Sequence, residues 1–126
     1  LFSNTLAPSI VGASIKVIDT LSSNNDLKNK LMSNAKYFRE KMSKAGFDIP
    51  NGIHPIVPVM LYDSTIAKKM ADELLKKGVY VIGFYFPVVP KGKARIRVQL
   101  SSIHSIEQID KAVNAFTEIG GKLEII

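Results

Sequence analysis

The sequence predicts an α+β fold in which a small, mostly antiparallel sheet is covered by helices on one face. Four segments repeat apolar residues every three or four positions, as amphipathic helices do, and three short segments have the apolar runs or alternation of β-strands. Their order is helix, helix, strand, helix, strand, strand, helix. With 126 residues, of which 46% are hydrophobic, the chain can form one packed core but not two.

Two helices are expected before the first strand. The first runs from Ala7 to about Leu21, and the polar residues 22–25 then supply the N-cap of a second helix that continues to Ala45. Gly46 ends the second helix, because glycine readily adopts the left-handed conformation found just past a helix. The residues expected on the buried face of this helix are Leu27, Leu31, Ala35, Phe38, Met42 and Ala45.

A strand over residues 54–62 and a third helix follow. Pro58 has no N–H to donate to a sheet, which favours an edge position or a local interruption of the strand. Asp63 or Ser64 is the expected N-cap of the helix, and Gly78 closes it. The residues expected to face inward are Ile66, Ala67, Met70, Ala71, Leu74 and Leu75.

Two strands and a last helix complete the predicted fold. Residues 79–86 are apolar on both faces, which predicts a central strand, and residues 87–92 form a loop. Residues 94–100 alternate between apolar and polar side chains, as a half-buried strand does. Ser105 with Gln108 three positions later is a capping box. It opens a helix whose inward residues are Ile106, Ile109, Ala112, Val113, Phe116 and Ile119.

The chain is basic, with 17 basic and 11 acidic residues and a net charge of +6. No acidic residue lies between positions 77 and 107. A solvated, lysine-rich surface explains this charge, and so does a polyanionic partner such as nucleic acid. Tyr80, Phe84 and Phe86 could stack on RNA bases, but strand alternation also places them with Ile82 on one apolar face. That pattern favours a place in the core and no nucleic-acid partner.

Several kinds of site have no support in the sequence. There is no cysteine, no glycine-rich nucleotide-binding motif, and no apolar stretch long enough for a membrane span. His54 and His104 are the only histidines, and neither has an acidic residue at metal-ligand spacing. We therefore expect no metal site, a structural hydrogen bond from His54, and a role for His104 in the turn before the last helix.

The best candidate for chemistry is the basic strand over residues 94–100. Arg95 and Arg97 are two positions apart, so they share a face opposite Ile96, Val98 and Leu100. A guanidinium can bind a carboxylate through two parallel hydrogen bonds. The alternatives left open by spacing alone are a carboxylate site and two solvated arginines on an open sheet face.

Four stretches of the chain resemble one enzyme family. They are residues 2–8 (Phe-Ser-Asn-Thr-Leu-Ala-Pro), 56–61 (Ile-Val-Pro-Val-Met-Leu), 83–97 (Gly-Phe-Tyr-Phe-Pro-Val-Val-Pro-Lys-Gly-Lys-Ala-Arg-Ile-Arg) and 101–109 (Ser-Ser-Ile-His-Ser-Ile-Glu-Gln-Ile). On these residues the chain resembles the α-oxoamine synthases, which are pyridoxal-phosphate enzymes of fold type I. The resemblance covers essentially the whole chain and implies the C-terminal small domain of such an enzyme.

The resemblance also implies an activity. The family's enzymes are homodimers that join an amino acid to an acyl-CoA on pyridoxal phosphate. Within the family, the chain is most similar to members that act in threonine degradation and use glycine and acetyl-CoA to form 2-amino-3-ketobutyrate. An aminolevulinate or 8-amino-7-oxononanoate synthase type of enzyme is the alternative, and an independent polyanion-binding module is a less favoured one.

By this resemblance, Arg97 corresponds to the arginine that binds the carboxylate of the amino acid, and Arg95 has a weaker claim. Ser3 and Asn4, or Thr5 beside them, correspond to the region that contacts the cofactor phosphate of the neighbouring subunit. On charge alone, Lys91 or Lys93 could meet phosphates of coenzyme A.

The family's cofactor-binding lysine, ring-stacking histidine and pyridine-pairing aspartate all correspond to positions before residue 1. We therefore expect this chain to bind no cofactor and to be inactive alone. Residues 1–22 are expected to connect to a large domain that precedes the chain, and residues 23–126 to form the small domain. The apolar stripe of the first helix should then be remodelled or covered by a partner chain. The expected location is the cytoplasm, or the mitochondrion in a eukaryote.

Overall fold

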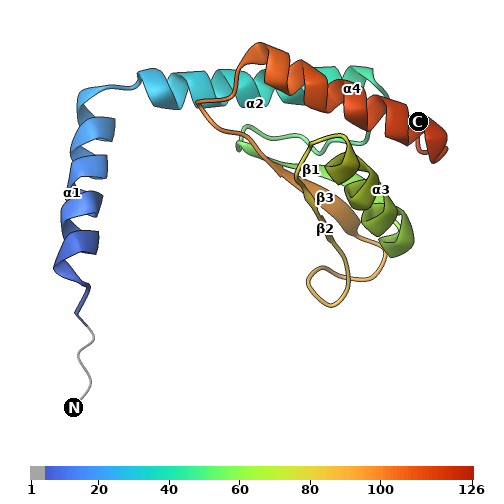
Figure 1. Cartoon of the computed structure of the whole chain (residues 1–126), viewed down its shortest axis with the longest axis horizontal. Coiled ribbons are helices and arrows are strands. Elements are labelled where there is room, and N and C mark those ends of the chain that lie inside the picture. Colours follow the sequence, from blue (N-terminus) through green and yellow to red (C-terminus); the bar gives the residue numbers. More distant parts are fainter. Residues whose placement is uncertain (1–4) are drawn as a thin grey trace.

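The computed structural model describes residues 5–126, and Figure 1 shows how the helices and strands of this part are arranged. In chain order they are α1 (Pro8–Ser23), α2 (Asp26–Lys44), β1 (Ile56–Tyr62), α3 (Ser64–Lys76), β2 (Ile82–Phe84), β3 (Ala94–Gln99) and α4 (Ile106–Lys122). The predicted α+β fold and the predicted order of elements are confirmed.

The sheet has the strand order β1–β3–β2, and both pairs of neighbours are antiparallel. β3 is central, with Val98 opposite Val57 and Ile96 opposite Val59. These four side chains are buried and point toward the helices. β1 lies at an edge of the sheet, as the proline at position 58 predicted.

The prediction of a long central strand over residues 79–86 was wrong. Only Ile82–Phe84 pairs with β3, and this strand lies at the other edge of the sheet. The side chains of Tyr80, Ile82 and Phe86 are 77%, 53% and 57% exposed, so they do not form a core face. Apolar residues on both faces of a strand indicate a central strand only where both faces of the sheet are covered. Here the helices among the described residues cover one face.

One hydrophobic core joins the covered face of the sheet to α2, α3 and α4. The ring of Phe116 makes edge-to-face contacts with those of Phe38 and Phe47, at centroid separations of 6.3 and 5.9 Å. The largest fully buried side chains are Phe38, Phe116, Met42, Met70, Leu74, Ile96, Val57 and Val59. The core thus draws on three helices and two strands.

The helix ends agree with the sequence analysis. Asp63 caps α3 by accepting hydrogen bonds from two backbone N–H groups of the first turn, at 2.7 and 2.9 Å. At the start of α4, Ser105 accepts from the Gln108 N–H and the Gln108 side chain accepts from the Ser105 N–H, which completes the predicted capping box. Gly46 and Gly78 follow α2 and α3 with positive φ angles of 101° and 78°.

Three residues of the helices that were predicted to be buried are exposed instead. Leu27, Leu75 and Ile106 have exposed fractions of 51%, 56% and 44%. Leu27 and Ile106 lie in the first turns of their helices, before the part of each helix that packs on the core. Leu75 is the next residue after the buried Leu74, and adjacent helical positions point about 100° apart. Helical spacing alone does not show where packing begins along a helix.

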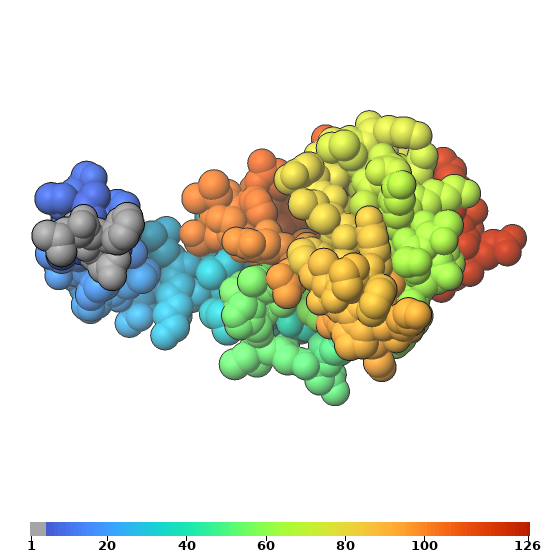
Figure 2. All heavy atoms as spheres, turned by 90° about the horizontal axis from the view of Figure 1, so that it is seen from below, coloured from blue at the N-terminus to red at the C-terminus, as the bar shows by residue number. Residues whose placement is uncertain are grey.

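α1 projects away from the rest of the molecule (Figures 1 and 2), and none of its residues is buried. It forms close to where the sequence predicted it. Its apolar stripe is exposed, and includes Ile10, Val17, Ile18 and Leu21 at 54%, 56%, 63% and 49%. No helix within residues 5–126 combines the length and the apolar character needed to cross a membrane.

Candidate functional site

One face of the sheet is not packed against the described helices, and we call it the open face. The strand register defines it, because residues paired across antiparallel strands share a face. It carries Ile56, Pro58 and Met60 of β1, Ile82 and Phe84 of β2, and Arg95, Arg97 and Gln99 of β3.

Arg97 projects onto the open face from the middle of the central strand. Its neighbours Ile96 and Val98 are buried and Arg97 is exposed, so the predicted alternation is confirmed. The guanidinium carbon of Arg97 lies 4.5 Å from the centroid of the Phe84 ring. Within residues 5–126, no hydrogen bond or ion pair occupies the N–H groups of this guanidinium. They remain available to an anion.

Arg95 lies on the same face but has a different environment. Its Nε donates a hydrogen bond to the carbonyl oxygen of Lys93 at 3.0 Å, and its side chain is half-buried. This bond ties Arg95 to the backbone just before its own strand. Of the two arginines, Arg97 therefore has the less restricted guanidinium.

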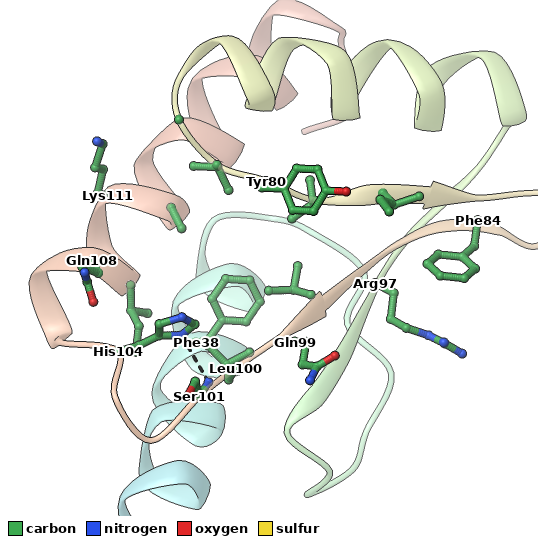
Figure 3. Close-up of a pocket in the computed structure, with 17 residues that line it drawn as sticks. Phe38, Tyr80, Phe84, Arg97, Gln99, Leu100, Ser101, His104, Gln108 and Lys111 are labelled. Atoms are coloured by element: carbon green, nitrogen blue, oxygen red, sulfur yellow. Dashed lines mark hydrogen bonds between the residues drawn. The ribbon is translucent and has the colours of Figure 1, made fainter.

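A cleft of about 800 Å³ borders the open face. It lies between residues 78–82, the second half of β3 and the first turns of α4 (Figure 3). Figure 3 shows Arg97 at one end, with its guanidinium beside Phe84, and His104 toward the other end. The polar residues that line the cleft are Arg97, Gln99, Ser101, His104, Gln108 and Lys111.

The loop before β3 carries the two lysines that were considered for coenzyme A phosphates. Lys91 and Lys93 are both exposed, and the Nζ of Lys91 lies 5.2 Å from the centroid of the Phe86 ring. Both lysines are accessible, and their assignment to coenzyme A stays a prediction.

The two histidines have the structural roles that the sequence predicted. The Nδ1 atom of His104 accepts a hydrogen bond from the Ser101 N–H at 3.2 Å, which holds the turn before α4. The Nδ1 atom of His54 accepts from the Ile56 N–H at 3.1 Å, at the start of β1. Over residues 5–126, no group of three or more His, Cys, Asp or Glu side chains could hold a metal ion.

Three residues with structural roles near the sheet were not predicted from the sequence. Phe84 was assigned to the core but lies on the open face against Arg97. Asn34 is buried in α2 and donates to two carbonyl oxygens of the turn that follows β3. Arg39 donates to the carbonyl oxygens of Pro50 and His54, both at 2.9 Å, and burial lowers the pKa of its guanidinium. Gly83 was a signal for the placement of Phe84. A glycine within a strand often marks the face that lies close to another backbone, and alternation then turns the next residue to the opposite face.

Ser3 and Asn4, predicted to contact the cofactor phosphate of a neighbouring subunit, lie outside the described residues. Thr5 is the first described residue and is exposed. Their assignment stays a prediction.

Comparison with known proteins identifies the family. Residues 1–116 match the family described as aminotransferase class I and II. The chain belongs to this family. The resemblance to the α-oxoamine synthases, which the sequence motifs predicted, is confirmed by individual relatives.

The chain is 55% identical to 2-amino-3-ketobutyrate coenzyme A ligase of Escherichia coli K12 over 126 residues, which is 100% of this chain and 32% of the ligase. The human mitochondrial ligase is 52% identical over 120 residues, or 95% of this chain and 29% of that protein. An 8-amino-7-oxononanoate synthase of Thermosipho melanesiensis is 40% identical over 126 residues, which is 100% of this chain and 32% of that protein. The chain thus spans about a third of the length of the curated relatives it matches.

Solved structures show the same fold. A serine palmitoyltransferase from S. paucimobilis, determined with bound PLP and myriocin, superimposes with a TM-score of 0.91 at 28% identity, over 100% of this chain and 32% of that chain. An 8-amino-7-oxononanoate synthase from Francisella tularensis gives a TM-score of 0.81 at 24% identity, over 100% of this chain and 36% of that one, and shows the fold alone. The α+β small domain is therefore shared with these proteins.

Proposed function

We propose that this chain is the C-terminal small domain of a pyridoxal-phosphate enzyme of the 2-amino-3-ketobutyrate coenzyme A ligase type, also called glycine C-acetyltransferase. The reaction joins glycine to acetyl-CoA and gives 2-amino-3-ketobutyrate and coenzyme A, a step of threonine degradation. The observation that carries this proposal is the 55% identity to the E. coli ligase over all 126 residues, against 40% to an 8-amino-7-oxononanoate synthase. As the chain spans about a third of these relatives, the activity belongs to a longer polypeptide.

In this proposal Arg97 binds the carboxylate of glycine. The central strand is held by neighbours on both sides, so the arginine starts from a rigid position. Its guanidinium is exposed on the open face and offers paired N–H donors that match the two oxygens of a carboxylate. Arg95 is tied to its own backbone and serves the strand rather than the substrate.

The described residues do not by themselves fit a pyridoxal-phosphate site. A lysine that forms an imine with this cofactor is usually desolvated, because the reaction needs its neutral amine. Every lysine of this chain is exposed. We therefore assign the cofactor's lysine to the remainder of the longer polypeptide.

The proposed assembly is a homodimer in which Ser3 and Asn4 reach the cofactor phosphate of the neighbouring subunit. Residues 1–22 would connect the large domain to a small domain of residues 23–126. The exposed stripe of α1 supports this division, because an apolar helix face needs a packing partner. We place the enzyme in the cytoplasm, or in the mitochondrion of a eukaryote, since the human relative is mitochondrial by name.

The proposal is tested in the full-length polypeptide loaded with pyridoxal phosphate. Arg97→Ala should raise the KM for glycine about 100-fold, because the bound carboxylate loses its partner, and should leave the KM for acetyl-CoA within about threefold. Arg95→Ala removes the same charge from the same face and is the matched control, with a change in the glycine KM below about threefold.

An unchanged KM for glycine in Arg97→Ala would refute the assignment of the arginine. Turnover of another amino acid or a longer acyl-CoA, without turnover of glycine and acetyl-CoA, would indicate a sister synthase instead.

A further inference from the structure

Phe84 contacts Arg97 diagonally across two strands. In the register of β2 and β3, Ile82 is opposite Arg97 and Phe84 is opposite Arg95. The Phe84 ring nevertheless lies 4.5 Å from the guanidinium carbon of Arg97. Diagonal neighbours in an antiparallel pair are within reach of aromatic and long side chains. The ring therefore faces the arginine that has no other side-chain partner among residues 5–126.

This kind of contact restrains an arginine without occupying its hydrogen-bond donors. The attraction acts between the positive charge and the π-electrons of the ring, so the N–H groups stay free. An ion pair with an aspartate or glutamate would instead occupy the donors that a carboxylate ligand needs. Arg95 illustrates the other situation, since its Nε is already engaged by the carbonyl oxygen of Lys93.

The backbone of β2 holds the Phe84 ring on the open face. Gly83 faces the helices, and a Cβ atom there would lie 3.1 Å from the carbonyl oxygen of Ala67 in α3. This glycine lets β2 lie close against α3, and strand alternation then turns Phe84 to the opposite face. The position of the ring is thus set by strand pairing and helix packing together.

We propose that Phe84 is a positioning residue that holds the Arg97 guanidinium ready to bind the substrate carboxylate. This inference rests on the proposed function of Arg97. In this role Phe84 acts through Arg97, so its effect should appear in the affinity for the amino acid rather than in the rate of the chemical steps.

The test compares variants of the full-length, cofactor-loaded polypeptide. Phe84→Leu keeps an apolar side chain but removes the π-system, and should raise the KM for glycine about fivefold, with kcat and the KM for acetyl-CoA within about twofold. Phe84→Tyr keeps the ring and should stay within about twofold of the parent protein. Phe84→Met is measured in parallel, so that poor folding of one variant does not decide the result. Phe86→Leu removes a ring that faces Lys91 instead and is the matched control.

A double-mutant cycle separates positioning from a general structural effect. In the Arg97→Ala background, Phe84→Leu should cause no further rise in the glycine KM, because the arginine that it positions is gone. An equal rise in both backgrounds, or no rise in either leucine or methionine variant while Arg97→Ala is impaired, would overturn the positioning role. An unimpaired Arg97→Ala would overturn the proposed function itself.

Discussion

At the scale of single residues, Asn34 joins two parts of the chain that are far apart in the sequence. Its Nδ2 atom donates to the carbonyl oxygens of Ser101 and His104, at 2.8 and 3.0 Å, and the residue is only 3% exposed. The same turn is held from within by the bond between the Ser101 N–H and the His104 ring. Asn34 therefore fixes the turn between β3 and α4, at the end of the cleft that Arg97 borders.

Replacing Asn34 should destabilise the fold. Asn34→Ala removes the donor of two buried carbonyl groups, and we expect the free energy of unfolding to fall by about 2 kcal/mol. Urea unfolding of the 126-residue chain measures this change. Asn114→Ala, at an exposed position of α4, is the control and should cause no loss. Equal unfolding midpoints for the Asn34→Ala variant and the parent chain would contradict the role given to Asn34.

At the scale of elements, the last turn of α4 contains two adjacent glycines in different environments. A Cβ atom on Gly120 would lie 2.6 Å from the Phe47 ring and 3.1 Å from the Ile126 side chain. A Cβ atom on Gly121 would meet nothing within 4 Å. Gly120 thus lets the last turn of α4 pack against the ring of Phe47, whereas Gly121 faces open space.

The two glycines should respond in opposite ways to alanine. Gly121→Ala should stabilise the chain by about 0.5–1 kcal/mol, because alanine favours the helix and nothing opposes its methyl group. Gly120→Ala gains the same propensity but forces Phe47 to move within a packed core, and we expect a net loss of about 1–2 kcal/mol. Thermal or urea unfolding of the two variants measures both changes in stability. A Gly120→Ala variant more stable than the parent chain would show that Phe47 can move aside at little cost.

A second link at this scale joins α3 to α4. The carboxylate of Glu118 accepts hydrogen bonds from the Nζ atoms of Lys77 and Lys122, both within 2.8 Å. These bonds lower the pKa of Glu118 to about 2. Two of the surface lysines are therefore paired with an acidic group, and the net charge of the chain stays at +6.

At the scale of the whole molecule, the core and α1 are separate in packing. Buried residues come from α2 onward, and α1 contributes none. A single helix without a packing partner is marginally stable in water. In this chain α1 should therefore add little to the stability of the rest.

Truncation tests this separation. A chain of residues 24–126 should unfold with a free energy within about 0.5 kcal/mol of the parent chain, because no buried contact is lost. In the parent chain, backbone amides of α1 should exchange with solvent much faster than those of the buried side of α4. A loss of 2 kcal/mol or more on truncation, or strong protection of α1 amides, would show that the helix packs on another surface in solution.

Local chemistry along the sequence was enough to place most elements. Three helix-end signals depend only on residues within four positions of each other, and all three occur as predicted. They are the capping box at Ser105, the cap at Asp63 and Gly46 after α2. Pro58 favoured an edge position or a local interruption of its strand, because it has no N–H to donate, and the edge position is the one that occurs. The family motifs identified the relatives for the same reason, since they are contiguous stretches of sequence.

The errors came from contacts between distant segments. Residues 79–86 were predicted to form a central strand, but only a short edge strand forms there. The sequence of this segment does not show whether a second layer covers the sheet. Phe84 was placed in the core for the same reason.

The alternation of apolar and polar residues in β3 was enough by itself to predict that the Arg97 side chain points away from the core. Successive side chains of a strand point to opposite faces of the sheet, whatever surrounds the strand. Only the tertiary structure decided what Arg97 meets there. The pairing of β2 with β3 and the approach of Gly83 to α3 bring the Phe84 ring to the guanidinium, and these contacts depend on how distant segments pack.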